Sequence, residues 1–161
     1  MALRKIVTEG DPILNKKCRP VEKFNQRLWD LLDDLVETLE NSGGVGLAAP
    51  QVGVMRRVCV IIIDEVVYEF INPVIVEAEG EQEVQEGCLS CPGEFGIIKR
   101  PARVKAEFLD RNGEKCELEG EELLAQAMCH EFDHLDGILF KSKVERMLTD
   151  KELDELRGEE D

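Results

Sequence analysis

The sequence predicts an α+β fold, in which antiparallel β-sheets pack around a buried C-terminal helix and an amphipathic helix lies near the N-terminus. Two observations lead to this class. One helix-like segment precedes a series of strand-like segments, and an apolar helix-like segment follows them. Helix, many strands, helix is an order typical of α+β proteins. The 161 residues are enough for one hydrophobic core, so we expect a single domain over residues 1–161.

The first helix is predicted over residues 24–40, after an irregular stretch of 1–23 that contains Pro12 and Pro20. Its apolar side chains recur with the period of one helix face, and acidic residues stand between them. These apolar positions are Phe24, Leu28, Leu31, Leu32, Leu35 and Leu39. A glycine-rich loop is predicted next, over residues 42–53.

The middle of the chain contains short runs of β-branched and aromatic residues, which predict strands. An acidic segment at 77–86 interrupts these runs, and the Asn112-Gly113 pair predicts the turn of a hairpin. The predicted strands cover residues 56–63, 66–71, 73–78, 97–109 and 115–119.

The last long helix is predicted over about 120–137. Residues 123–129 are apolar on nearly every side, which is typical of a buried helix. Gly120 precedes the helix, acidic residues occupy its first turn, and Gly137 is a suitable stop at its end.

Two histidines, the only ones in the chain, stand four residues apart in this helix, in the sequence His130-Glu131-Phe132-Asp133-His134. At that spacing both side chains lie on one helix face, where they can bind one metal ion. Glu131 follows about 100° round the helix and would reach a water molecule on that metal as a general base. A buried helix with two histidines, two acids and no local basic partner is best explained by a metal cation.

The Cys88-x-x-Cys91 pair leaves three interpretations open. A redox dithiol would need a thioredoxin-like βαβ frame, which the predicted elements lack. A structural zinc site would use both cysteines with both histidines and would be closed. An open hydrolytic site would use Cys88 alone as the third ligand and keep a position for water. A zinc peptidase is a further alternative, with Glu145 as its third ligand.

The composition of the chain limits the classes of partner and the location that we expect. A net charge of −15 argues against broad binding to phosphate backbones, so we expect no direct nucleic-acid binding. No apolar run approaches a membrane span and no signal peptide is visible, so the cytoplasm is the expected location, with an organelle as the alternative. The loop at 42–53 lacks the pattern of a nucleotide cradle, and its glycines fit a close approach of backbone to a ligand, with the Gln51 amide as a donor.

Three segments together resemble the signature motifs of the peptide deformylases. They are Gly44-Val45-Gly46-Leu47-Ala48-Ala49-Pro50-Gln51, Glu86-Gly87-Cys88-Leu89-Ser90 and the 130–134 motif, in the family's order and at compatible separations. The resemblance covers roughly residues 1–145. It implies a single metallohydrolase domain that removes the N-formyl group from the initiating methionine of newly made proteins. The expected partners are N-formylmethionyl peptides and nascent chains.

The resemblance also implies residue roles. Cys88, His130 and His134 would bind one divalent metal ion, ferrous iron in cells, with zinc, nickel or cobalt as substitutes. Glu131 would move the proton, and the Gln51 amide, the Leu89 backbone N–H and the metal would hold the formyl oxygen as it becomes an oxyanion. Gly46 would bring backbone close to the substrate. The pocket for the methionine side chain is assigned to Val45, Leu123 and Ala127.

The sequence departs from common family patterns in three places. Cys129 stands where many members have glutamine, and Gln126 puts a polar group on the predicted pocket wall. Residues 143–161 hold four basic and eight acidic side chains, a net charge of −4, with a short helix predicted at 150–157. Some members are thought to dock on the ribosome through a basic C-terminal helix, and the acidic tail from about 149 does not suit that role.

Overall fold

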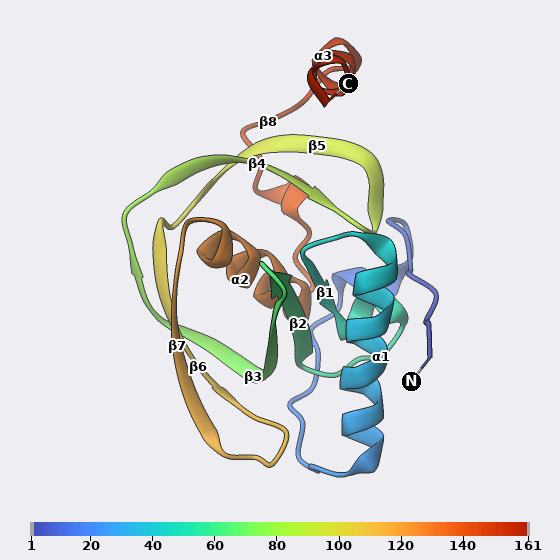
Figure 1. Cartoon of the computed structure of the whole chain (residues 1–161), viewed down its shortest axis with the longest axis vertical. Helices are drawn as coiled ribbons and strands as arrows, with labels where there is room; N and C mark the ends of the chain where they lie inside the picture. The colour runs from blue at the N-terminus through green and yellow to red at the C-terminus, as the bar shows by residue number, and fades with distance from the viewer. Residues whose placement is uncertain (1, 161) are drawn as a thin grey trace.

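The structure is a computed structural model that describes residues 2–160, with side chains described through residue 156 (Figure 1). Its helices are α1 (Gln26–Ser42), α2 (Glu122–Leu135) and α3 (Asp150–Glu160), with 3₁₀ turns at Pro12–Asn15, Ala49–Val52 and Phe140–Ser142. Its strands are β1 (Gly46–Ala48), β2 (Val58–Ile63), β3 (Val66–Glu79), β4 (Gln82–Cys88), β5 (Cys91–Arg100), β6 (Arg103–Leu109), β7 (Lys115–Glu121) and β8 (Arg146–Met147).

The strands form two antiparallel sheets around α2. The larger sheet has the order β1-β2-β3-β6-β7, and the smaller has the order β4-β5-β8. Figure 1 shows α2 enclosed by these strands, with α1 on the outside of β1 and β2. The predicted α+β class, with antiparallel sheets around the histidine-bearing helix, is therefore confirmed.

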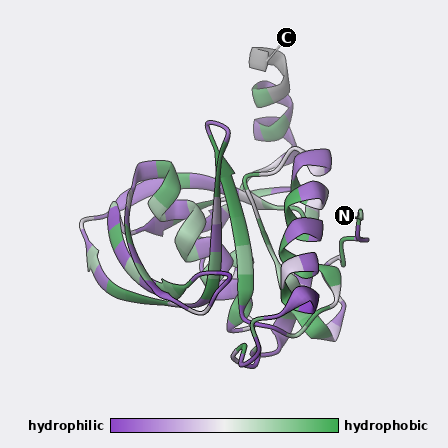
Figure 2. Cartoon of the chain, turned by 60° about the horizontal axis from the view of Figure 1, so that its bottom comes forward, coloured by the Kyte–Doolittle hydropathy of each residue, from purple (hydrophilic) through white to green (hydrophobic). Residues whose placement is uncertain are grey.

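Helix α1 begins two residues later than predicted, because the side chain of Asn25 caps it by accepting from the Leu28 N–H. It ends at Gly43, whose φ of 75° is the left-handed conformation common after a helix. The predicted leucines form its buried face and pack on β2, with Leu32, Leu35 and Leu39 fully buried. Figure 2 shows the strands beside α1 as largely hydrophobic, while α1 itself carries both kinds of residue.

The two strands predicted at 66–71 and 73–78 are one strand, β3. Asn72 adopts a φ of 51° between them, and the pairing of β3 with β6 shifts register there. The Asn72 amide also exchanges two hydrogen bonds, of 2.8 and 2.9 Å, with the backbone of Val21. The gap between the two predicted strands is therefore a β-bulge at Asn72, which fastens the N-terminal stretch to the sheet.

The single strand predicted at 97–109 is wrong, because the chain turns at Pro101 and continues as β6 in the other sheet. Several short elements were also not predicted. The acidic segment at 77–86 is largely strand, the glycine-rich loop contains β1 and a 3₁₀ turn, and β8 pairs with β5 at Gly96 and Ile97. The hairpin turn at Asn112-Gly113 is confirmed, since it joins β6 to β7 and Gly113 has a φ of 80°.

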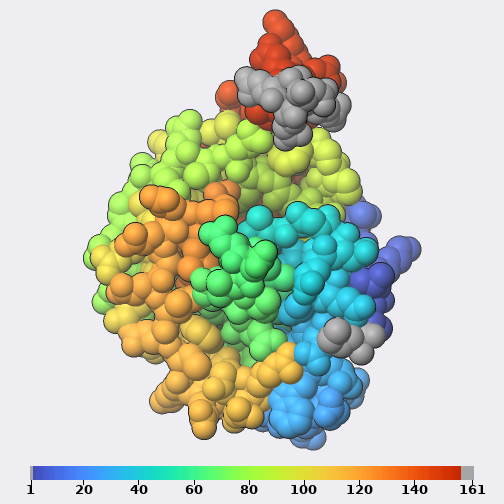
Figure 3. All heavy atoms as spheres, in the orientation of Figure 1, coloured from blue at the N-terminus to red at the C-terminus, as the bar shows by residue number. Residues whose placement is uncertain are grey.

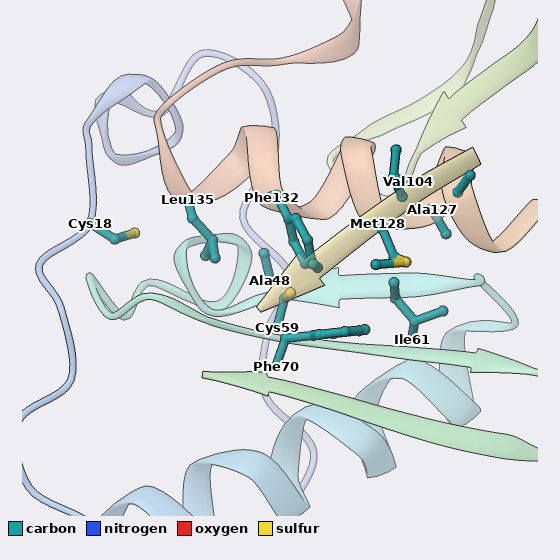
Figure 4. Packing of buried hydrophobic residues seen from close by; sticks show 12 residues of the cluster. Cys18, Ala48, Cys59, Ile61, Phe70, Val104, Ala127, Met128, Phe132 and Leu135 are labelled. Atoms are coloured by element: carbon teal, nitrogen blue, oxygen red, sulfur yellow. The ribbon is translucent and has the colours of Figure 1, made fainter. Parts of the chain in front are cut away.

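Helix α2 is two residues shorter at each end than predicted, and Gly137 follows it with the expected left-handed φ of 76°. Figure 4 shows its apolar side directed at the large sheet. Phe132 packs edge-on against Phe70 of β3, with the ring centroids 5.1 Å apart. The whole cluster is apolar and buried, so its closely packed side chains hold the helix backbone, and with it the histidines, in a fixed position.

Helix α3 extends to residue 160, three residues beyond the predicted helix. Figure 3 shows it standing away from the body of the molecule. No helix within residues 2–160 is both long and apolar enough to cross a membrane.

Candidate metal centre and active site

Three predicted ligands meet between α2 and the turn that joins β4 to β5. The Nε2 atoms of His130 and His134 are 3.2 Å apart, and the Cys88 Sγ lies 3.3 Å from the His134 Nε2. All three atoms lie within 4.8 Å of one another. The helix spacing places the histidines one turn apart, and Cys88, the last residue of β4, reaches His134 from the small sheet. Two imidazoles and one thiolate of this kind suit a divalent transition metal.

The surroundings of these atoms also suit a cation. Both imidazoles are buried, and burial lowers the pKa of His134 well below its usual value, so that this ring is neutral and available as a ligand. The pKa of Cys88 is raised, first by its hydrogen bond with Cys91 and then by burial. A neighbouring cation would reverse that shift, because the thiolate is the form that binds metal.

The other ligand sets suggested by the sequence are not assembled. Cys91 is absent from the group of converging ligand atoms, and its thiol donates instead to the Glu9 carboxylate at 3.3 Å. Glu145 is exposed and forms an ion pair with Lys99 at 3.2 Å. The geometry therefore favours three ligands with an open position over a closed site with both cysteines.

Glu131 lies beside the converging atoms. Its Oε2 is 3.9 Å from the His130 Nε2, and its buried Oε1 has no hydrogen-bond partner among the described residues. Burial raises the pKa of Glu131 to about 7. A carboxylate with a pKa near neutrality and an unused oxygen can both accept and return a proton.

Sequence reasoning missed a buried network behind His130. The Glu86 carboxylate contacts the His130 Nδ1 and also accepts two hydrogen bonds from Arg100, at 2.5 and 3.1 Å. Arg100 also donates a hydrogen bond to the Asp133 carboxylate at 2.9 Å. Arg100 is thus the basic partner that α2 lacks within its own sequence. Burial alone would raise the pKa of Glu86, but His130 and Arg100 outweigh it and lower the pKa to about 2. A carboxylate on the far nitrogen fixes the ring so that Nε2 faces the ligand group.

Two further predicted residues border the centre. The Gln51 side chain accepts from the Ala48 N–H, and its Nε2 donates to the Cys88 Sγ at 3.4 Å and to the Ser90 Oγ at 3.1 Å. The Leu89 backbone N–H has no acceptor outside the strand ladders in the described part of the chain. Leu89 thus offers a free donor, whereas donation by Gln51 to a ligand would replace one of its present contacts.

A cavity of about 490 Å³ opens onto His130 and Glu131. All four residues assigned to substrate binding line it: Val45 and Leu123 are exposed, Ala127 is buried and Gly46 is half-buried. Gln126 also lines it, with its amide held by the Gln85 carbonyl at 3.1 Å. Cys129 does not line the cavity.

Gly46 has a specific neighbour. A Cβ at this position would lie 2.5 Å from the Glu131 Oε2 and 2.8 Å from the Glu131 Cδ. The second glycine of the motif, Gly46, is therefore needed to leave room for the Glu131 carboxylate, a requirement that the motif spacing alone does not reveal.

Converging ligands with an open side, a buried carboxylate beside them and an adjoining cavity define a metal-dependent hydrolase of the H-E-x-x-H kind. Residues 3–150 match the family described as polypeptide deformylase, so the chain belongs to the peptide deformylase family. It is an enzyme that removes the formyl group from N-formylmethionyl peptides.

Individual relatives agree with this assignment. The chain is 55% identical to a peptide deformylase of Acetivibrio thermocellus, covering 98% of this chain and 92% of the relative. It is 53% identical to one of Caldanaerobacter subterraneus subsp. tengcongensis, covering 96% and 97%. The crystal structure of peptide deformylase from Thermotoga maritima matches with a TM-score of 0.87 at 38% identity, covering 89% of this chain and 99% of that one.

Proposed function

We propose that Cys88, His130 and His134 hold the catalytic metal ion and that Glu131 moves the proton during deformylation. The observation that carries this proposal is the meeting of three ligand atoms, all within 4.8 Å, beside a buried carboxylate oxygen without a partner. When bound, the metal would activate a water molecule and polarise the formyl carbonyl.

The other steps of the reaction are assigned to side chains and backbone groups of the protein. Glu131 takes a proton from the attacking water and gives it to the amine nitrogen as the C–N bond breaks, which releases formate and a free N-terminus. The Leu89 N–H and one Gln51 N–H donate to the formyl oxygen, where negative charge develops. The Glu86 carboxylate keeps the His130 ring in place through this change of charge.

The metal in cells is proposed to be ferrous iron, one ion for each chain, with zinc, nickel or cobalt as substitutes. Ligand chemistry alone would also accept zinc, so iron is supported by the family resemblance rather than by the donor set.

Nascent chains are the proposed partners, and their methionine side chain would enter the cavity lined by Val45, Leu123 and Ala127. The cytoplasm is the proposed location. A single catalytic domain with a separate acidic tail is proposed as its organisation.

The two cysteines provide a matched test. Cys88→Ser replaces a soft thiolate by a hard oxygen, so we expect severe loss of bound metal and of formate release from a formyl-Met peptide. Cys91→Ser alters a buried thiol three residues away and should leave both nearly unchanged. The measurement is metal analysis and turnover of anaerobically purified protein, which also identifies the bound ion. Equal metal loss in both variants would show instead a site that uses both cysteines.

A further inference from the structure

A groove of about 650 Å³ at the N-terminal end of α1 is lined by basic side chains. Arg19 and Lys23 come from the segment before the helix, Arg27 from its first turn, and Arg56 from the turn before β2; all four are exposed. This end of α1 is the lower end in Figure 1, and the catalytic cavity borders the other end at Ser42 and Gly43. Helix α1 is about 25 Å long, and the groove reaches Leu31 on it, so about 16 Å of helix separates Leu31 from Ser42 at the cavity.

These cations lack counterions. Arg19, Lys23, Arg27 and Arg56 form no ion pair with any side chain described in residues 2–156, although the protein carries 35 acidic residues. By contrast, each basic side chain of β5 and β6 is ion-paired: Lys99, Arg100, Arg103 and Lys105. Glu22 is the single acid among the lining residues, and Arg4, the fifth cation of the groove, is neutralised by Asp34 at 2.8 Å.

The fold itself gathers these charges. The backbone of Arg19 pairs with that of Arg56 in an isolated bridge, with the Arg57 N–H donating to the Arg19 carbonyl at 3.1 Å. The first turn of α1 adds the positive end of a long helix dipole at Asn25 and Arg27. Like charges that line one groove repel one another, so an anion bound there would be stabilised by them.

The lining favours one class of anion. Leu28 and Leu31 in the floor are only 5% and 6% exposed, so neither side chain offers a deep apolar anchor for a protein segment. No aromatic residue is among those that line it, so it offers no platform for stacking a base. Guanidinium groups bind phosphate oxygens in a two-pronged manner, and a groove of this volume is larger than one phosphate ion.

We infer that this groove binds the phosphodiester backbone of RNA, without sequence preference, through Arg19, Lys23, Arg27 and Arg56. Newly made chains are attached to RNA while they are synthesised, so contact at this end would leave the catalytic cavity open at the other. The negative net charge of the whole chain does not exclude such a site, because the acidic residues are unevenly distributed along the sequence. Residues 1–57 hold nine basic and eight acidic side chains, and residues 58–161 hold 11 and 27. At physiological ionic strength, charges beyond about 8 Å are largely screened, so the distant acids weaken contact in the groove only slightly.

The test uses full-length, metal-loaded enzyme and a fluorescein-labelled 12-nucleotide uridine RNA, with binding followed by anisotropy. We expect saturable binding at low salt that weakens with a log–log slope of about −2 to −3, as three or four phosphate contacts predict. Arg19→Glu/Arg56→Glu should weaken binding at least tenfold, with turnover of a formyl-Met tripeptide unchanged. Lys151→Glu, an exposed lysine on α3, is the control and should bind like the wild type.

Three results would overturn the inference: no binding by the wild type, equal weakening by the control, or an unchanged affinity in the double variant. Displacement of the RNA by inorganic phosphate at an equal concentration of phosphate groups would also overturn it, because it would identify a small-anion site. Since the tripeptide assay reports catalysis separately, failure of RNA binding leaves the proposed catalytic roles untouched.

Discussion

The residue with the clearest chemical assignment is Glu131, because its carboxylate is buried beside the ligand atoms without being one of them. Glu131→Gln keeps the side chain's size and removes its capacity to accept a proton. We expect turnover to fall by about 10²- to 10⁴-fold, the usual contribution of a general base. Metal content should stay at the wild-type level. A variant with near-normal turnover, or one that loses its metal, would refute the proposed division of labour.

Gly46 is predicted to matter through Glu131 rather than through the substrate. In Gly46→Ala the new methyl would meet the Glu131 carboxylate at 2.5 Å, so the carboxylate must move. We expect kcat/KM to fall at least tenfold, about 1.4 kcal/mol of barrier, with the metal retained.

A double-variant cycle separates this mechanism from a direct effect on binding. In a Glu131→Ala background the carboxylate is absent, so adding Gly46→Ala should cause little further loss of residual activity or of thermal stability. Losses that add fully in the double variant would show that Gly46 acts elsewhere.

At the scale of elements, the limits of sequence reasoning follow from particular contacts. The spacing of the histidines and the period of the leucines are local patterns. The two helices that they predict, α2 and α1, are both confirmed by the structure. Arg100 was missed as part of the site because its partners Glu86 and Asp133 come from a different strand and from α2. The continuity of β3 through Asn72 was missed because its bulge depends on pairing with β6 and on the contact with Val21. Patterns within one element and the turn of the β6–β7 hairpin could be predicted, whereas the contacts of Arg100 and Asn72 with distant parts of the chain could not.

The C-terminal elements β8 and α3 can be removed separately by truncation. Helix α3 is tied to the body by an exposed ion pair between Arg146 and Glu152 at 2.8 Å, a kind of contact worth under about 1 kcal/mol. Deleting residues 149–161 removes that contact and no predicted site residue. We expect turnover of a small formyl-Met peptide to stay almost unchanged.

The deeper deletion of residues 144–161 is the contrasting variant. It also removes β8 and the hydrogen bonds of Glu145 and Leu148 to β5 at Ile97 and Phe95, so its thermal stability should be clearly lower. A loss of activity above about tenfold in the shorter deletion, with the fold intact, would show that α3 supports the active site.

On the scale of the whole molecule, the proposed ligands join the small sheet to α2, which are also linked by the Glu86–His130 contact and the Arg100–Asp133 ion pair. Cys88 belongs to the small sheet, while both histidines belong to α2, which packs on the large sheet. Among the described residues, the cluster of buried apolar side chains at the small sheet consists of Cys91 and Ile98 of β5 and Phe140 of a 3₁₀ turn, with partly buried neighbours. A bound ion would therefore cross-link α2 to the thinly packed small sheet. Binding it should raise the free energy of unfolding of the protein.

Removing the metal tests this directly. A ligand that binds only the folded state stabilises it by about 2.7 kcal/mol when present at 100 times its Kd. For a domain of this size that corresponds to a fall in Tm of about 5–10 °C after chelation under anaerobic conditions. Cys88→Ala should start at the lower Tm and respond little to chelator, because one arm of the cross-link is gone. Cys91→Ser should behave like the wild type, since Cys91 is not one of the converging ligand atoms and a serine hydroxyl can still hydrogen-bond to Cys88. An identical Tm with and without chelator in the wild type, with metal loss verified by analysis, would show that the sheets are held together without the ion.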